Sequence, residues 1–222
     1  MAVRLPAIPP MLDALQIVRL HDEATLRWHR GEPSPGEADA FTVDSQPSAG
    51  LSELVLAHHR SNFDLWHEED KTRAPGATDG ELACGKHAID ALNQARNDLM
   101  EAMDRLLLEA VGKQRPDAPL HSESPGLILD RLSILALKLY HTAEESCRAS
   151  ASEAHRQRNL ERLHLLEDQR GDLAGCLDAL WTEVLAGRRR FKLYRQLKMY
   201  NDPELNPAVY SHKAETRAGH TG

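Results

Sequence analysis

The chain has 222 residues, which is long enough to bury the core of one folded domain without disulfides or a structural metal. Its hydrophobic fraction of 41% and its charged fraction of 27% are ordinary for a soluble protein and exclude a disordered chain. The most apolar stretch, residues 127–140, includes Asp130, Arg131 and Lys138, so it is too short and too charged to span a membrane.

The cysteines and the N-terminus predict a cytoplasmic protein. The three cysteines are far apart and lack CxxC spacing, which indicates reduced thiols. Pro6, Pro9 and Pro10 interrupt any apolar run near the N-terminus, so no secretory signal is visible. The net charge of -7 argues against a nucleic-acid partner.

Helical periodicity recurs along the chain, and no segment alternates apolar and polar residues over the length of a strand. We therefore predict an all-α fold, a helical bundle of five to six helices in a single domain over residues 1–210, with a flexible tail at 211–222. Prolines and glycines predict a loop at 31–50. Helices are expected at 10–30, 50–73, 80–112, from the N-cap Ser124 and Pro125 onward, and at 155–200, where Gly171, Gly175 and Gly187 are candidate kinks or breaks.

One pattern occurs in both of the first two predicted helices: a histidine followed seven residues later by Trp-His. His21 precedes Trp28 and His29, and His59 precedes Trp66 and His67. Seven residues are two helical turns, so the histidine and the tryptophan of each copy share one face. One copy alone cannot chelate a metal, because its histidines lie about 10 to 12 Å apart along the helix axis.

The inward face of the second helix becomes polar toward its end, and buried polar groups need partners. The third and fourth helices offer Arg96, Asn97, Asp130 and Arg131 as complements. We predict that these helices enclose a polar pocket for an anionic ligand, either a phosphate or a sugar nucleotide. The alternative is a satisfied buried network that only sets the register of the helices. The predicted ligand-binding residues are His59, Asn62, Trp66, Arg73, Arg96, Asn97, Glu123, Asp130, Arg131 and Lys138.

Within this pocket Arg73, Arg96 and Arg131 would hold the anion. His67, Glu69 and Asp70 are the candidate catalytic residues, since a histidine beside a carboxylate can act as an acid or base. The chain lacks the common hydrolase, nucleotide-binding, dehydrogenase and zinc motifs, so the reaction stays open.

Two alternative functions follow from other residues. Asp70, Glu101 and Asp104 are candidate ligands of Mg²⁺ in a phosphohydrolase. The basic stretch 188–198 could instead dock a phosphate or an acidic partner as a non-catalytic adaptor. The candidate docking residues are Arg188, Arg195, Lys198, Asn201 and Asp202.

Four separated blocks resemble a known family: SNFDLWHEEDKTR at 61–73, IDALNQARNDLMEAMD at 89–104, SESPGLILDRLSILALKLYH at 122–141 and YRQLKMYNDPELNP at 194–207. They are similar to the uncharacterised bacterial family known as domain of unknown function 4254 (DUF4254). The resemblance implies that the polar residues of these blocks are functional. It also implies a role in cell-envelope glycan metabolism, with a glycosyltransferase as a possible partner, because genes of the family often lie near glycosyltransferases.

Overall fold

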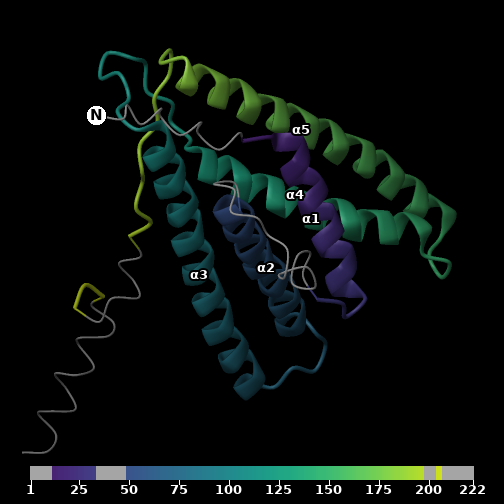
Figure 1. The fold of residues 1–222 in the computed structure, drawn as a ribbon. Helices are drawn as coiled ribbons and strands as arrows, with labels where there is room; N and C mark the ends of the chain where they lie inside the picture. The colour runs from purple at the N-terminus through teal and green to yellow at the C-terminus, as the bar shows by residue number, and fades with distance from the viewer. Residues whose placement is uncertain (1–11, 34–48, 198–203, 207–222) are drawn as a thin grey trace, which may run out of the picture.

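Five α-helices form the fold of the described residues, which are 12–33, 49–197 and 204–206 of the computed structural model (Figure 1). This part of the chain contains no β-strand, only an isolated parallel bridge between Leu120 and Arg190. Within it, no helix is both long and apolar enough to cross a membrane. The all-α prediction is therefore confirmed. The helices are α1 (Ala14–His29), α2 (Ala49–Thr72), α3 (Asp79–Val111), α4 (Pro125–Cys147) and α5 (Glu153–Leu185).

Two helical hairpins, α2–α3 and α4–α5, make up the body of the fold. Figure 1 shows the α2–α3 pair in blue and teal, and the α4–α5 pair crossing it in teal and green. The first helix, α1, contacts α4, α2 and α5. Residues from α1, α2 and α4 can therefore meet although the chain separates them widely.

The central helix of the bundle is α4, whose apolar side chains are buried against the other helices. Leu129 and Leu132 of α4 are completely buried together with Met103 and Leu107 of α3 and Leu177 of α5. Complete burial of one such side chain contributes about 1.5–3 kcal/mol to folding. Because α4 is packed on several sides, its polar residues Asp130 and Ser133 are buried as well, whereas Arg131 and Lys138 are exposed.

The start of α4 agrees with its sequence signal. Ser124 is the N-cap, and its side chain accepts a hydrogen bond from the backbone N–H of Leu127 at 3.4 Å. Pro125 is the first helical residue, where the missing N–H costs nothing. On α3, Asp104 Oδ1 accepts the backbone N–H of Gly126 at 2.7 Å, which joins α3 to this helix start.

The helix predicted over 155–200 ends at Leu185, beside Gly187, one of the glycines expected to kink or break it, and residues 186–197 are not helical. Gly171 and Gly175 are accommodated within α5, whereas Gly187 takes a φ of 67° just after the helix and ends it. The chain then runs non-helically, with Phe191 buried and its backbone N–H and C=O both bonded to the Gln114 side chain at 2.9 Å. Arg188 and Arg195 therefore lie on a non-helical segment, and Lys198, Asn201 and Asp202 lie outside the described residues.

Candidate metal centre and neighbouring cavities

A buried carboxylate, Asp130 of α4, joins α2, α3 and α4. Its Oδ1 lies 3.0 Å from Nε2 of His58 and accepts hydrogen bonds from Nδ2 of Asn62 at 3.2 Å and Nε of Arg96 at 2.6 Å. Burial raises the pKa of Asp130, but the His58 ring and the Arg96 guanidinium outweigh burial and hold the pKa well below its ordinary value. The carboxylate is therefore ionised at neutral pH and shared among three partners.

His59 extends this network into the core. Its Nδ1 bonds to the Ser133 hydroxyl at 2.8 Å, and its Nε2 lies 2.8 Å from the Thr25 hydroxyl. Burial lowers the pKa of His59 to about 3, so the ring is neutral at physiological pH. A completely buried, neutral and fully bonded histidine fixes how α1, α2 and α4 pack, which fits the structural alternative better than the predicted ligand contact.

Six of the predicted residues line one cavity of about 350 Å³ between α2, α3 and α4. Its inner end is formed by Asn62 and apolar side chains. Arg73 lies at its outer rim, where 67% of the arginine side chain is accessible to solvent. The predicted residues that line it are Asn62, Trp66, Glu69, Asp70, Arg73 and Arg96.

The arginines of this cavity are already paired with acids. Arg73 lies 2.8 Å from Glu69, and Arg96 donates through Nε and Nη2 to both carboxylate oxygens of Asp130. Asp70 adds a further negative charge at the rim. The cavity therefore carries little uncompensated positive charge for an anion.

Three of the remaining predicted binding residues belong to a separate cavity beside a neighbouring face of α4. Glu123, Arg131 and Lys138 line a second cavity of about 570 Å³ between α4 and α5, and Arg131 pairs with Glu123 at 2.9 Å. Ile134 is the residue of α4 that lines both cavities. The single pocket expected from the sequence is thus divided in two, and Asn97 lines neither half.

The acidic residues proposed to hold Mg²⁺ do not meet. Asp70 lies at the rim of the first cavity, and Glu101 accepts the backbone N–H of Gln196 at 2.8 Å. Asp104 is buried against the start of α4, and burial raises its pKa to about 6. No group of three potential metal ligands within the described residues contains any of these acids.

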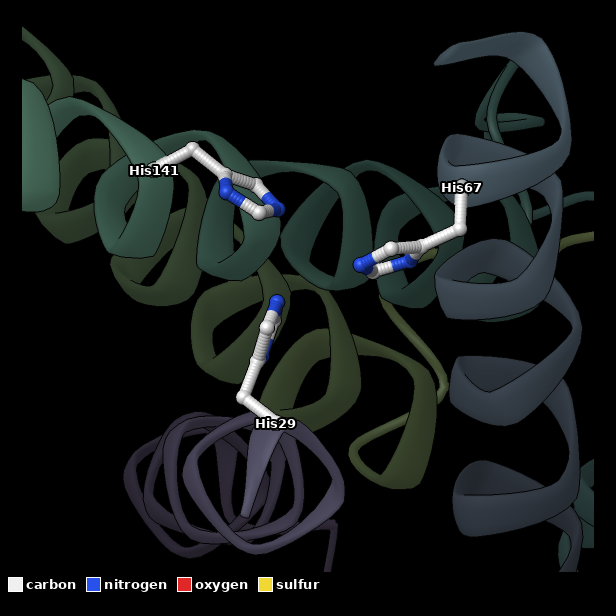
Figure 2. Close-up of side chains that lie close together, drawn as sticks. All are labelled: His29, His67 and His141. Carbon is white, nitrogen blue, oxygen red and sulfur yellow. The ribbon is translucent and has the colours of Figure 1, made fainter. Parts of the chain in front are cut away.

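Three histidines from three helices do meet. His29 ends α1, His67 lies near the end of α2, and His141 lies on α4; one ring nitrogen of each is within 4.8 Å of the others. Figure 2 shows the three rings directed toward one common space between these helices. Among the described residues this is the sole group of three or more side chains with metal-binding chemistry at such a separation.

Hydrogen bonds fix the orientation of all three rings. Nδ1 of His29 donates to the carbonyl of Thr25, and Nδ1 of His67 donates to the carbonyl of Phe63, each at 2.8 Å. Nδ1 of His141 donates to Glu144 Oε2 at 3.0 Å. These oxygens can only accept, so each Nδ1 carries the proton, and Nε2 of a neutral ring offers a lone pair.

Two of the three free nitrogens lack another partner. Nε2 of His29 and Nε2 of His141 are both buried, and neither has a hydrogen-bond partner among the described residues. Burial lowers the pKa of His29, which favours its neutral ring. Buried nitrogens without a partner are costly unless something binds them.

Aromatic rings surround the three histidines. Tyr140 stacks on His29 with ring centroids 4.0 Å apart, and Trp66 stacks on His141 at 4.9 Å. Phe63 packs against His67 at 4.3 Å. Trp66 therefore forms a wall of the first cavity and also packs on the histidine cluster.

The histidine cluster was not predicted, although its residues stand out in the sequence. His29 and His67 are the last residues of the two Trp-His copies, and His141 ends the third family-like block. The repeat was interpreted within each helix, where the distance excludes chelation. The contact is instead between the copies, which only the packing of α1 against α2 and α4 reveals.

Comparisons with known proteins bear on identity but not on activity. The model of the family described as "Protein of unknown function (DUF4254)" matches residues 52–193, a range that includes His67 and His141 but not His29. A search of curated proteins found no match, and neither did a search of solved structures. The match covers more than half of the chain, so the chain belongs to the DUF4254 family.

Proposed function

We propose that the protein binds one divalent transition-metal ion, foremost Zn²⁺, through Nε2 of His29, His67 and His141. The observation that carries the proposal is the convergence of three imidazoles whose other nitrogens are already engaged. Metal-binding histidines almost always donate their second ring N–H to a carbonyl or a carboxylate. All three rings follow this arrangement.

The spacing suits a metal after a small movement. Zinc binds imidazole nitrogen at about 2.0–2.1 Å, so three ligands of a tetrahedral ion lie about 3.4 Å apart. The nitrogens, now within 4.8 Å of one another, would approach by roughly 1 Å or more in total, which small side-chain rotations can supply. Imidazole ligands favour zinc, copper, nickel and iron over Mg²⁺.

Titration calorimetry of the full chain with ZnCl₂ tests this function. We expect one zinc per chain for the wild type. Loss of a group that only hydrogen-bonds to a metal ligand typically weakens metal binding ~10–100-fold. Replacing His29, His67 or His141 by alanine removes a ligand itself, so it should weaken zinc binding by more than this. Circular dichroism of each metal-free variant would verify that it is folded.

His121 provides a matched control. Its Nδ1 also donates to a backbone carbonyl, that of Glu123, at 2.7 Å, but it is not part of the cluster. His121→Ala should bind zinc as tightly as the wild type. Equal affinity in the wild type and in all three cluster variants would refute the proposal.

We also propose an anionic ligand and a role in cell-envelope glycan metabolism. The ligand is anionic, and His67 serves as a metal ligand instead of a general base because both its nitrogens are engaged in the cluster. Membership of the family supports a role in cell-envelope glycan metabolism only through the neighbourhood of its genes. Measuring the melting temperature of the protein with a series of sugar nucleotides tests that ligand class, because a ligand that binds the folded state raises the melting temperature.

The two alternatives have less support. A Mg²⁺-dependent phosphohydrolase would need Asp70, Glu101 and Asp104 to meet, and they lie apart. An adaptor would dock a glycosyltransferase through the basic segment that begins at Arg188. The described part of this segment, residues 188–197, is not helical, so it would not present a helix to the partner.

A further inference from the structure

The number of protein ligands distinguishes two kinds of metal site. Structural zinc sites are closed by four protein ligands, whereas catalytic sites use three and leave one position for water or substrate. The histidine cluster contains three, and no fourth His, Cys, Asp or Glu of the described residues joins it. Glu144 is occupied on the far side of the His141 ring, where it accepts the Nδ1 proton.

The cluster lies near the surface. All three histidines are half-buried, and 24% of the His141 side chain is accessible, although Nε2 of His29 and Nε2 of His141 are themselves buried. Tyr140, which stacks on His29, is half-buried as well. With three protein ligands, an ion held by the three Nε2 atoms would keep one coordination position for water or a ligand.

Charge makes such an ion a stronger anion-binding group than the paired arginines of the two cavities. Three neutral imidazoles leave both positive charges of a divalent ion uncompensated. By contrast, Arg73 is paired with Glu69, Arg96 with Asp130 and Arg131 with Glu123. The aromatic rings around the cluster exclude part of the solvent, which strengthens the attraction between the ion and an anion.

We infer that the metal site has an open fourth position, occupied by water, and that an oxyanion, the phosphate or carboxylate group of a ligand, displaces this water. The inference rests on the proposed function. It assigns the anionic ligand to the metal ion, not to the arginines of the cavities. The first cavity, which shares Trp66 with the cluster, would hold the rest of the ligand.

Visible absorption of the Co²⁺-loaded full chain tests the inference, because the spectrum of Co²⁺ depends on its ligands and coordination number. Inorganic phosphate and acetate are the probes. We expect that adding the anion changes the Co²⁺ spectrum, and that the change saturates at one bound anion per Co²⁺. A response to phosphate alone assigns the site to phosphates, and a response to both assigns it to oxyanions in general.

Arg73→Gln and Arg131→Gln are the control variants, because both arginines are exposed and their loss should not disturb the core. The anion response should survive in both. Loss of the response in either variant would overturn the inference by placing the anion on an arginine. Co²⁺ that binds but ignores both anions would also overturn it, since a fourth protein ligand then closes the site, while metal binding itself would stand. Failure to bind Co²⁺ or Zn²⁺ would remove the proposed function as well.

Discussion

The same local arrangement holds the second histidine of both Trp-His copies. His29 and His67 each donate Nδ1–H to the carbonyl four residues earlier on their own helix, at Thr25 and Phe63. The helix itself therefore presets the tautomer and the direction of each Nε2. His141 obtains the same result from the Glu144 side chain one turn later.

Asp130 is the residue whose loss should destabilise the fold most clearly. Asp130→Ala would leave Arg96 and His58 without their carboxylate in a largely buried place. We expect the free energy of unfolding at pH 7 to fall by about 3 kcal/mol, measured by urea denaturation. Asp117→Ala is the control, because Asp117 pairs with Arg115 on the surface and its loss should change nothing measurable. Equal effects of the two substitutions would contradict this account.

The pH dependence of the Asp130 effect has a defined sign. The pKa of Asp130 is depressed in the folded state, so its stabilising effect is complete above the unfolded value of about 3.9. The effect is lost as the pH falls below that value toward the folded pKa. The difference in unfolding free energy between wild type and Asp130→Ala should therefore shrink below about pH 4.

At the level of single residues, the sequence predicted some of the side chains of α2 that turn inward, but it missed His58, which is buried against Asp130. The helical period places Asn62 and Trp66 on the inner face, and both line the first cavity. The same period cannot show that Arg96 and Arg131 line different cavities, since that depends on which helices pack against each face of α4. For the same reason the meeting of His29 with His67 could not be derived from either helix alone.

Some boundaries of the helices were predictable from a cap or a glycine. Ser124 and Pro125 start α4 as expected, and α3 ends just before Gly112, whose φ is 70°. The last helix was predicted too long because the charged stretch after Gly187 keeps helical composition. Burial of Phe191 and its bonds to Gln114 stabilise a non-helical path that no local pattern indicates.

The contact between α3 and the start of α4 depends on Gly126. A Cβ added there would lie 2.8 Å from the carbonyl oxygen of Met100 and 2.9 Å from Oδ1 of Asp104. Gly126→Ala should therefore push the two helices apart and lower the free energy of unfolding by about 1–3 kcal/mol, measured by thermal or urea denaturation.

Gly175 gives a control of opposite sign. It lies inside α5 with no other atom within 4 Å of an added Cβ. Gly175→Ala should raise the free energy of unfolding by about 0.5–1 kcal/mol, because alanine restricts the unfolded chain and favours the helix. Destabilisation by Gly175→Ala, or tolerance of Gly126→Ala, would show that the packing of these helices differs from the one described.

In the whole molecule, the metal centre lies where α1, α2 and α4 come together (Figures 1 and 2). The chain order separates these three helices, so the site exists only in the folded protein. An ion bound there would link α1 to both hairpins. Binding to the folded state alone would also stabilise the whole fold.

X-ray absorption at the zinc edge of the Zn²⁺-loaded full chain would identify the atoms that bind the metal. We expect low-atomic-number neighbours at about 2.0–2.1 Å with the outer-shell pattern of three imidazoles, reduced to two in His141→Ala. Sulfur neighbours at about 2.3 Å, from the exposed Cys84, Cys147 or Cys176, would contradict this expectation. So would an imidazole pattern that His141→Ala leaves unchanged.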